Sequence, residues 1–135
     1  MSADASVKTV ESLYEAFVHG DAPGLLEKLW DDIDWAMETT STAMPWYGVR
    51  HGKDEVASFL QQLDSTMEVK DFTPVLFAVH GSDVLTVVRF RADNRATGVP
   101  VAMDLYQRFT FRDDKIFYFR SSEDTAQMVA ASHGA

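Results

Sequence analysis

VAMDLYQRFTF (Val101–Phe111) and KIFYFR (Lys115–Arg120) are two aromatic-rich stretches joined by the short turn Arg112-Asp113-Asp114. Aromatic and β-branched residues on either side of a tight turn predict a long antiparallel hairpin. The hairpin runs into SSEDTA (121–126), which we expect to begin a helix. A hairpin that closes a sheet and leads into a short helix is typical of a conical α+β cup with a central pocket. Inward residues of the strands would line this pocket, and Gln107 is the most informative of them.

The elements upstream of the hairpin fit the same architecture. Apolar residues recur at helical spacing from Val7 to Val18, and Gly20 suits the cap that ends this helix. Asp21 and Pro23 predict a second short helix whose apolar face includes Leu25, Leu26, Leu29 and Trp30. A strand over 33–39, a loop over 40–52, a helix over 53–63 and strands over 68–80 and 84–93 follow. Pro74 marks the strand over 68–80 as bent or on an edge. Helices followed by an antiparallel meander give the class α+β: a curved, mostly antiparallel sheet wrapped around N-terminal helices.

Length and composition limit the functions that the protein can have. The chain has 135 residues, no cysteine and a formal net charge of −9. We expect one domain over 1–135 with an ordered core over 5–131. A negative surface disfavours nucleic acid and anionic membranes as partners, and the missing cysteines exclude disulfides and thiol catalysis. No signal peptide and no membrane-spanning stretch are recognised, so the expected location is cytoplasmic.

A set of landmarks along nearly the whole chain carries a resemblance to a known family. They are Tyr14-Glu-Ala-Phe17, Gly20-Asp21, Pro45-Trp46, GKDEVASF (52–59), Phe72-Thr-Pro74, Ala96-Thr-Gly98, Phe109-Thr-Phe111 and Asp124-Thr-Ala126. In order and spacing the chain resembles the SnoaL-like, ketosteroid isomerase-related proteins of the nuclear-transport-factor-like superfamily. The resemblance implies a cone-shaped sheet, an apolar pocket and a homodimer packed through the outer sheet face. It does not fix an activity, because this fold hosts isomerases, cyclases, hydrolases, dehydratases and non-catalytic binding proteins.

The acids of a ketosteroid isomerase have no counterpart in this sequence. In that enzyme an aspartate is the base, and a neutral carboxylic acid and a tyrosine hold the oxyanion. The resemblance places Met37 at the base and Gln107 at the second acid, with Tyr14 near the tyrosine. Methionine cannot take a proton, and an amide does not titrate. Steroid isomerisation is therefore not expected.

Two candidate residues and one group of arginines keep two interpretations each. Gln107 either orients a ligand and polarises its carbonyl, or is a structural amide bonded to backbone or water. Asp124 either projects a carboxylate toward the pocket mouth or belongs to the N-terminus of the last helix. Arg89, Arg91 and Arg120 are either a carboxylate-binding patch or the partners of nearby acids.

The expected pocket lining is mostly aromatic and thioether. It comprises Tyr14, Trp35, Met37, Met44, Trp46, Phe59, Met103, Leu105, Gln107 and Phe119. No cofactor is implied, since the four histidines lack metal-ligand spacing and no phosphate-binding loop is present.

The sequence predicts a protein that binds a small apolar organic molecule. If it is an enzyme, the expected chemistry is cofactor-free isomerisation, hydration or cyclisation. Asp124 or Glu38 would carry the proton, and Gln107 and Tyr14 would polarise the ligand. The alternatives are a non-catalytic carrier and a dimeric interaction module whose pocket is filled by its own side chains.

Overall fold

The computed structural model describes residues 1–134, which form four helices and six strands. In chain order these are α1 (Ala3–Val18), α2 (Ala22–Leu26), β1 (Leu29–Met37), β2 (Gly48–His51), α3 (Lys53–Thr66), β3 (Met67–His80), β4 (Asp83–Asn94), β5 (Pro100–Arg112), β6 (Lys115–Ser122) and α4 (Thr125–Ser132). The expected α+β class, with helices first and a short helix last, is confirmed.

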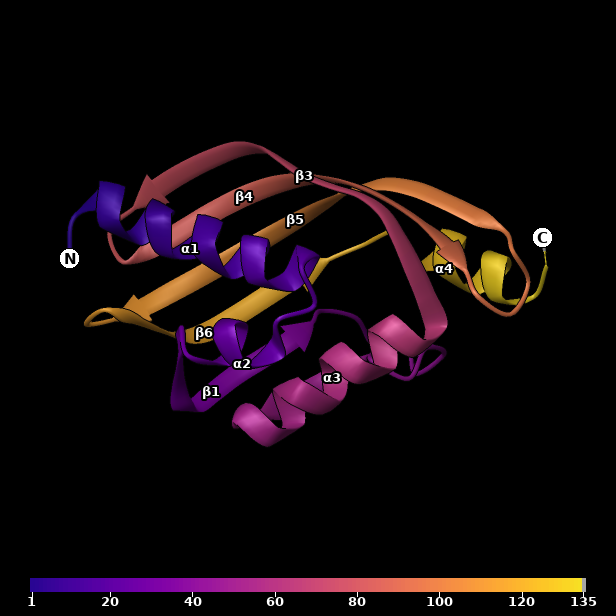
Figure 1. Cartoon of the computed structure of the whole chain (residues 1–135), viewed down its shortest axis with the longest axis horizontal. Coiled ribbons are helices and arrows are strands. Elements are labelled where there is room, and N and C mark those ends of the chain that lie inside the picture. The colour runs from indigo at the N-terminus through magenta and orange to yellow at the C-terminus, as the bar shows by residue number, and fades with distance from the viewer. Residues whose placement is uncertain (135) are drawn as a thin grey trace.

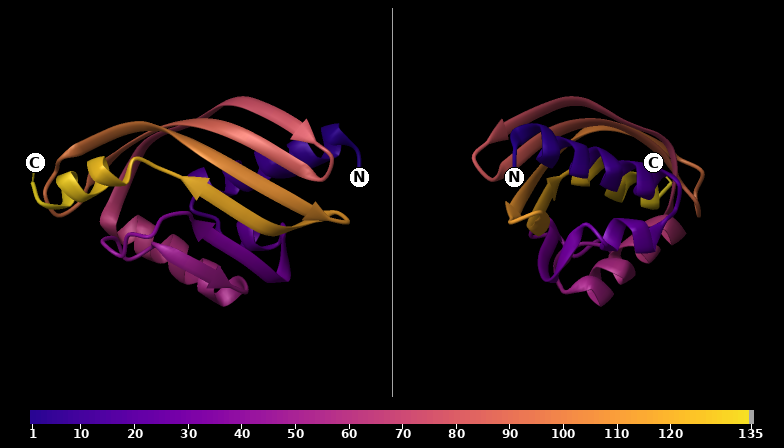
Figure 2. Two further views of the ribbon diagram at one scale, coloured as in Figure 1. Left: turned by 180° about the vertical axis from the view of Figure 1, so that it is seen from behind. Right: turned by 60° about the vertical axis from the view of Figure 1, so that its left-hand side comes forward.

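All six strands belong to one open sheet in the order β2-β1-β6-β5-β4-β3. Every neighbouring pair is antiparallel except β1 with β6, which is parallel. The sheet curves strongly, so that β3 and β4 arch over α1 while β1 lies on the opposite side (Figures 1 and 2). Helices α1, α2 and α3 lie on the concave side, and α4 lies beyond the end of β6 (Figure 1). This arrangement confirms the predicted cup.

Helix α1 supplies the centre of the core. Ser2 caps it by accepting a hydrogen bond from the backbone N–H of Ala5. Val10, Leu13 and Tyr14 recur at helical spacing and are buried against the sheet. On the sheet, inward residues of the strands alternate with outward ones, so one face is buried and the other faces solvent. The inward face therefore surrounds the space that any pocket would occupy.

The second helix is shorter than the sequence predicted. It ends at Leu26, and Leu29 and Trp30 belong to β1. The Trp30 indole N–H donates to the backbone oxygen of Arg112, 2.6 Å away. The backbone N–H of Ile116 also bonds Lys28, so contact with β6 holds this segment extended. The predicted loop over 40–52 also contains β2, which pairs with β1.

The end of β6 corrects the predicted helix start. The strand continues through Ser122, because Ser121 pairs with Gln107 on β5 and its carbonyl accepts from the N–H of Glu38 at 2.6 Å. Helix α4 begins only at Thr125. Strand β3 lies at one edge of the sheet and has a register shift next to Pro74, which confirms the predicted bend and edge position. No helix in residues 1–134 is long and apolar enough to span a membrane.

Candidate functional site

An apolar pocket lies between the concave face of the sheet and the helices. It is lined by Leu13, Tyr14, Phe17, Leu25, Trp35, Met37, Trp46, Phe59, Leu60, Leu63, Phe72, Phe90, Leu105, Gln107, Phe119, Ser121, Glu123 and Met128. The space open to the centre of a water molecule is about 60 Å³. One water needs roughly 10–15 Å³ by that measure. The pocket is therefore small but not filled by its own side chains.

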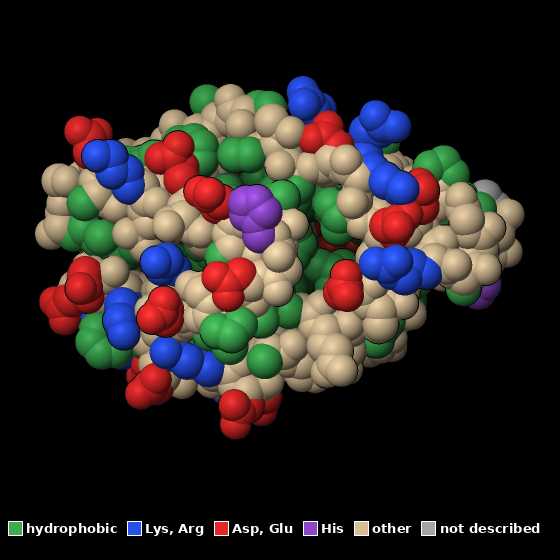
Figure 3. Space-filling model, in the orientation of Figure 1, with side chains coloured by type: hydrophobic (Ala, Val, Ile, Leu, Met, Phe, Trp, Pro, Cys, Tyr) green, Lys and Arg blue, Asp and Glu red, His purple; other side chains and the backbone are tan. Residues whose placement is uncertain are grey.

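A wider outer chamber adjoins this inner pocket. Its volume is about 450 Å³, and the two share Phe17, Leu25, Leu60, Leu63 and Phe72. Figure 3 shows a hollow on this face, with hydrophobic side chains inside it and charged side chains around it. The two spaces therefore lie on either side of the same apolar side chains.

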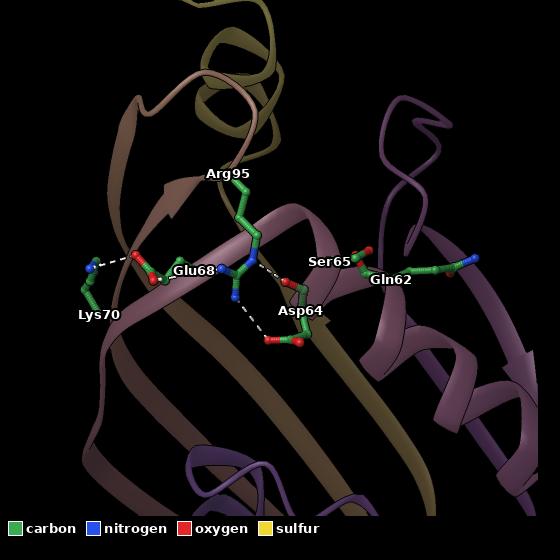
Figure 4. Close-up of polar contacts among 6 residues, drawn as sticks. All are labelled: Gln62, Asp64, Ser65, Glu68, Lys70 and Arg95. Atoms are coloured by element: carbon green, nitrogen blue, oxygen red, sulfur yellow. Dashed lines mark hydrogen bonds and ion pairs between the residues drawn. The ribbon is translucent and has the colours of Figure 1, made fainter.

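Ion pairs form one side of the chamber rim. Arg95 donates to the backbone oxygen of Asp64 at 2.6 Å and lies 3.8 Å from the carboxylate of Glu68, which also pairs with Lys70 at 2.7 Å. Figure 4 shows Arg95 between the end of α3 and the start of β3. These contacts link the segment after β4, the end of α3 and the start of β3 at one side of the chamber.

Alternation along β6 decides which polar groups enter the pocket. Phe119, Ser121 and Glu123 are two residues apart, and all three line the pocket. In a strand, residues two apart point to the same face. Ser121 stands beside Gln107 on β5 and beside Met37 on β1. The pocket wall thus changes from aromatic to polar along a single strand.

Glu123 is the acid of the inner pocket. Its Oε1 accepts a hydrogen bond from the Trp46 indole N–H at 3.3 Å, and its Oε2 accepts from the Tyr47 hydroxyl at 3.1 Å. Burial raises the pKa of Glu123 to about 7, with a smaller contribution from the charge of Asp124, while the two hydrogen bonds act in the opposite direction. A carboxyl group with a pKa near neutrality can both take up and release a proton at physiological pH.

A second polar group of residues connects helix α1 to the sheet. The Tyr14 hydroxyl donates to Oε1 of Gln107 at 2.6 Å, and the Gln107 amide donates to the Ser121 hydroxyl at 3.2 Å. Tyr14 also lies 2.6 Å from the Thr86 hydroxyl. Since an amide oxygen only accepts, the single proton of Tyr14 goes to Gln107, and Thr86 donates to Tyr14. Burial raises the pKa of Tyr14 well above its ordinary value, so the phenol stays neutral.

Trp35 forms the aromatic wall of the pocket. It stacks on Phe119 with ring centroids 3.9 Å apart and meets the edge of Phe59 at 5.6 Å. Hydrogen bonding to β2 and β6 on both sides holds its backbone. The ring is therefore fixed in place by packing from several directions.

Eight of the ten side chains predicted to line a pocket do so. They are Tyr14, Trp35, Met37, Trp46, Phe59, Leu105, Gln107 and Phe119. Met44 is buried but is not part of the lining, and the sulfur of Met103 accepts from the backbone N–H of Asp124 at 3.4 Å. Their common role as ligand-binding residues stays a prediction.

Neither predicted proton carrier lies in the pocket. The Glu38 side chain is 68% exposed and lies 4.0 Å from Arg120, because its one-residue step from Met37 turns it to the outer face. Asp124 is exposed and caps α4 by accepting from the N–H of Gln127 at 3.1 Å. The interpretation that places Asp124 at the N-terminus of the last helix is confirmed, although Asp124 is itself the cap and Ser121 belongs to β6. The geometry assigns proton transfer to neither Glu38 nor Asp124.

Two of the three arginines on the outer face pair with acids. Arg89 lies 2.8 Å from Asp71, and Arg120 lies 2.9 Å from Asp34. For these two the ion-pairing interpretation is confirmed. Arg120 also lies over the ring of Tyr118, so packing contributes to its position.

Sequence reasoning missed Glu123, although a signal for it was present. The alternation of Phe119, Ser121 and Glu123 continues the inward face of β6, but the expected helix start interrupted it. Among residues 1–134, no group of three or more His, Asp or Glu side chains is arranged to hold a metal ion.

Comparison with known proteins gives the family. The profile of the SnoaL-like domain matches residues 10–119. An NTF2-like protein of unknown function from Burkholderia pseudomallei is 26% identical, with a TM-score of 0.88 over 97% of this chain and 98% of that chain. An NTF2-like protein from Burkholderia xenovorans is also 26% identical, with a TM-score of 0.85 over 97% and 98% of the two chains.

A third solved structure bears a functional name. It is a candidate SnoaL-like polyketide cyclase from Mesorhizobium loti, whose name also gives carbohydrate phosphatase in brackets. It is 25% identical, with a TM-score of 0.70 over 85% of this chain and 96% of that chain. A search of curated proteins found no match. Because the domain profile spans most of the sequence and the fold agrees, this chain belongs to the SnoaL-like domain family.

Proposed function

We propose that this protein is a cofactor-free acid–base enzyme that acts on a small, mostly apolar carbonyl compound, with Glu123 as the proton carrier. The observation that carries the proposal is a carboxyl group inside an apolar pocket, with a pKa raised to about 7 by burial. Perturbed acids in pockets are enriched at functional sites. A purely structural carboxyl gains little from such a position, because burial destabilises its charged form.

The surroundings of Glu123 suit proton transfer. Trp46 and Tyr47 donate one hydrogen bond to each of its oxygens and so fix its orientation. Ser121 and Gln107 lie on the same wall and provide neutral groups that can orient a polar atom of the ligand. The remaining walls are aromatic or aliphatic, which suits a flat apolar skeleton.

The proposed step needs no other reactant. The Glu123 carboxylate removes a proton from a carbon next to the carbonyl, and the C–H electron pair forms the C=C bond of an enolate. Negative charge then resides on the carbonyl oxygen. Return of the proton from Glu123 to another carbon of that skeleton completes an isomerisation. In a ring closure the enolate carbon instead attacks a second carbonyl carbon of the same molecule, whose C=O electron pair moves to oxygen, and Glu123 gives its proton to that oxygen. The name of the Mesorhizobium loti relative supports this class of chemistry.

The test is exchange of α-protons for deuterium. Acetophenone, 2-indanone and 2-tetralone would be incubated with the protein in D₂O, and loss of the α-proton signal would be followed by NMR. We expect acceleration that increases through about pH 7, because the carboxylate is the active form. Glu123→Gln should lower the rate by about 10²–10⁴, the usual contribution of a positioned acid–base group.

Glu38→Gln is the matched control, since it changes an exposed carboxylate on a neighbouring strand end and should leave the rate unchanged. Equal rates in the wild type and Glu123→Gln would contradict the assignment of Glu123. Binding of these ketones without any exchange would favour the alternative function, a non-catalytic carrier.

We also propose that the protein forms a homodimer through the outer face of the sheet. Leu76, Leu85 and Tyr106 are 55%, 45% and 58% exposed. Strand pairing places them close together, since Val87 faces both Leu76 and Tyr106 across the sheet. Clustered apolar side chains on one face support an interface more than scattered ones would.

A further inference from the structure

A chain of hydrogen bonds crosses the interior of the cup and ends at Ser121. Thr86 on β4 donates to Tyr14 on α1, and Tyr14 donates to Oε1 of Gln107 on β5. The Gln107 amide then donates to the Ser121 hydroxyl on β6 at 3.2 Å. Each hydroxyl before Ser121 gives its only proton to the next member, so the chain runs in one direction.

The Ser121 hydroxyl is a buried donor whose proton has no acceptor. Ser121 is 6% exposed, and among residues 1–134 its side chain bonds only the Gln107 amide. Because Oγ accepts in that bond, its own proton points away from Gln107. A buried donor without an acceptor is costly and uncommon in native proteins. Ser121 lines the inner pocket, so a molecule bound there can supply the missing acceptor.

A second donor lies beside this hydroxyl. The Gln107 amide nitrogen has two protons, gives one to Ser121 and has no acceptor for the other among the described residues. Since the two donor atoms are 3.2 Å apart, one oxygen can accept from both. Tyr14, the residue nearest to the expected oxyanion donor, has no proton left for a ligand because its proton goes to Gln107.

The groups that can contact a ligand follow one another along β6. Phe119 forms an aromatic wall with Trp35, Ser121 comes two residues later, and Glu123 two residues after that. Residues two apart in a strand point to the same face and lie about 7 Å apart. The order along the strand is therefore an aromatic surface, a hydroxyl donor and an acid. A flat ketone whose carbonyl lies between a ring and an acidic carbon has its groups in the same order.

We infer that the Ser121 hydroxyl binds the carbonyl oxygen of an aryl alkyl ketone, whose ring lies toward Phe119 and whose acidic carbon lies toward Glu123. This inference rests on the proposed function, because it names the group that the substrate of Glu123 must present. Negative charge that develops on the oxygen during proton removal would strengthen the hydrogen bond from Ser121. The donors that precede Ser121 in the chain would polarise its hydroxyl in the same direction.

The test uses two probes that differ in the oxygen. Acetophenone and ethylbenzene have the same ring and the same number of carbons, and only acetophenone accepts a hydrogen bond. Dissociation constants of both would be measured by NMR titration for the wild type and Ser121→Ala. Comparison of the two ratios cancels the difference in hydration of the probes. We expect Ser121→Ala to reduce the preference for acetophenone by about threefold to tenfold, the usual worth of one hydrogen bond.

Ser122→Ala is the matched control. It removes the same hydroxyl one residue further along β6, where the side chain is exposed on the opposite face. Its preference for acetophenone should equal that of the wild type.

A second readout uses the wild type itself. The carbonyl ¹³C resonance of a ketone moves downfield when its oxygen accepts a hydrogen bond. Bound acetophenone should therefore resonate downfield of acetophenone in cyclohexane, and Ser121→Ala should reverse part of this shift. In the α-proton exchange assay, Ser121→Ala should lower the rate by about 10²-fold, the usual effect of removing one donor to an oxyanion.

The outcomes separate the two proposals. An unchanged preference in Ser121→Ala, or a bound carbonyl resonance equal to that in cyclohexane, overturns the role of Ser121 and leaves Glu123-dependent exchange intact. Failure of both probes to bind overturns the inference together with the pocket on which it depends. A preference that depends on Ser121, without exchange in the wild type, would confirm the contact with the oxygen and contradict the proposed enzyme.

Discussion

The hydroxyl of Tyr47 donates to Oε2 of Glu123 across 3.1 Å, which joins the loop after β1 to the end of β6. Trp46 donates to the other carboxylate oxygen, so two consecutive residues hold one partly buried acid. Both donors favour the charged form of Glu123, whereas burial favours the neutral form and prevails. The protonation of this acid therefore affects both the stability and the chemistry of the pocket.

Stability should depend on pH through Glu123. Burial raises its pKa from 4.5 to about 7 in the folded protein. Between these values the folded protein holds a proton that the unfolded chain has released, so the free energy of unfolding falls as pH rises. The stabilising contribution of Glu123 to the free energy of unfolding is fully present below about pH 4.5 and is lost above about pH 7. We expect the free energy of unfolding of the wild type to fall by up to about 3 kcal/mol relative to that of Glu123→Gln between these pH values.

Urea unfolding at pH 5 and pH 8 would measure this difference. Comparison with Glu123→Gln removes the contribution of the other acids, which both proteins share. Glu38→Gln should follow the wild type at both pH values, because its side chain lies outside the pocket. If the difference in free energy of unfolding between the wild type and Glu123→Gln is the same at pH 5 and pH 8, Glu123 does not titrate in this range.

Removal of the Tyr47 hydroxyl should raise the pKa of Glu123 further. Tyr47→Phe keeps the ring and deletes one donor to the carboxylate, and that donor acts to lower the pKa. A ¹³C NMR titration of the glutamate side-chain carboxyl would report the change, with the resonance assigned from Glu123→Gln. Tyr118→Phe is the control, since Tyr118 packs against Arg120 on β6. A lower pKa in Tyr47→Phe would mean that the hydroxyl does not stabilise the carboxylate.

Much of the fold could be predicted because local signals agreed with the final structure. Ile33, Trp35 and Met37 alternate with less apolar neighbours, and all three are buried. The aromatic hairpin and its turn also lie where the sequence placed them. Period-two alternation fixes the face of a strand, and so most of the pocket lining followed from it.

The errors arose where two periodicities overlap. Leu25, Leu26, Leu29 and Trp30 fit a helix, but tertiary contact with β6 makes the last two a strand. Ser121–Ala126 resembles a capped helix, yet only Asp124 caps one. That single shift in boundary concealed Glu123, whose inward position depends on β6 continuing past Arg120.

Asp124 should matter for stability and not for chemistry. Its side chain accepts from the N–H of Gln127 at the start of α4. Asp124→Ala should lower the free energy of unfolding by about 1 kcal/mol, whereas Asp124→Asn keeps a capping acceptor and should change it little. Both variants should retain α-proton exchange. Loss of exchange in Asp124→Asn at unchanged stability would restore Asp124 as a catalytic candidate.

The proposed dimer should dissociate when charge enters its apolar face. Tyr106→Glu places a carboxylate among Leu76, Val87 and Leu85, which like Tyr106 face outward. Light scattering after size-exclusion chromatography should give twice the 15.1 kDa chain mass for the wild type and the single mass for the variant. Val49→Glu, on the edge strand β2, is the control and should stay dimeric. A monomeric wild type would end the proposal.

Gln107 and Tyr14 should be energetically coupled. Tyr14 donates to Gln107 across 2.6 Å, and both side chains line the pocket. Gln107→Leu leaves the buried phenol without its acceptor, which should cost about 1–3 kcal/mol of stability. In Tyr14→Phe that donor is already gone, so the same leucine substitution should cost about 1 kcal/mol less. Urea unfolding of the wild type, the two single variants and the double variant would measure this coupling.

Ligand binding distinguishes a site role of Gln107 from a structural one. Gln107→Leu with unchanged acetophenone affinity and strong coupling to Tyr14 would make Gln107 a structural amide. A weaker affinity for acetophenone but not for ethylbenzene, which has the same ring and no oxygen, would show that the amide contacts the ligand oxygen. If the losses of unfolding free energy in Tyr14→Phe and Gln107→Leu simply add in the double variant, the hydrogen bond between the two side chains is contradicted. Two groups that share one buried proton cannot be independent.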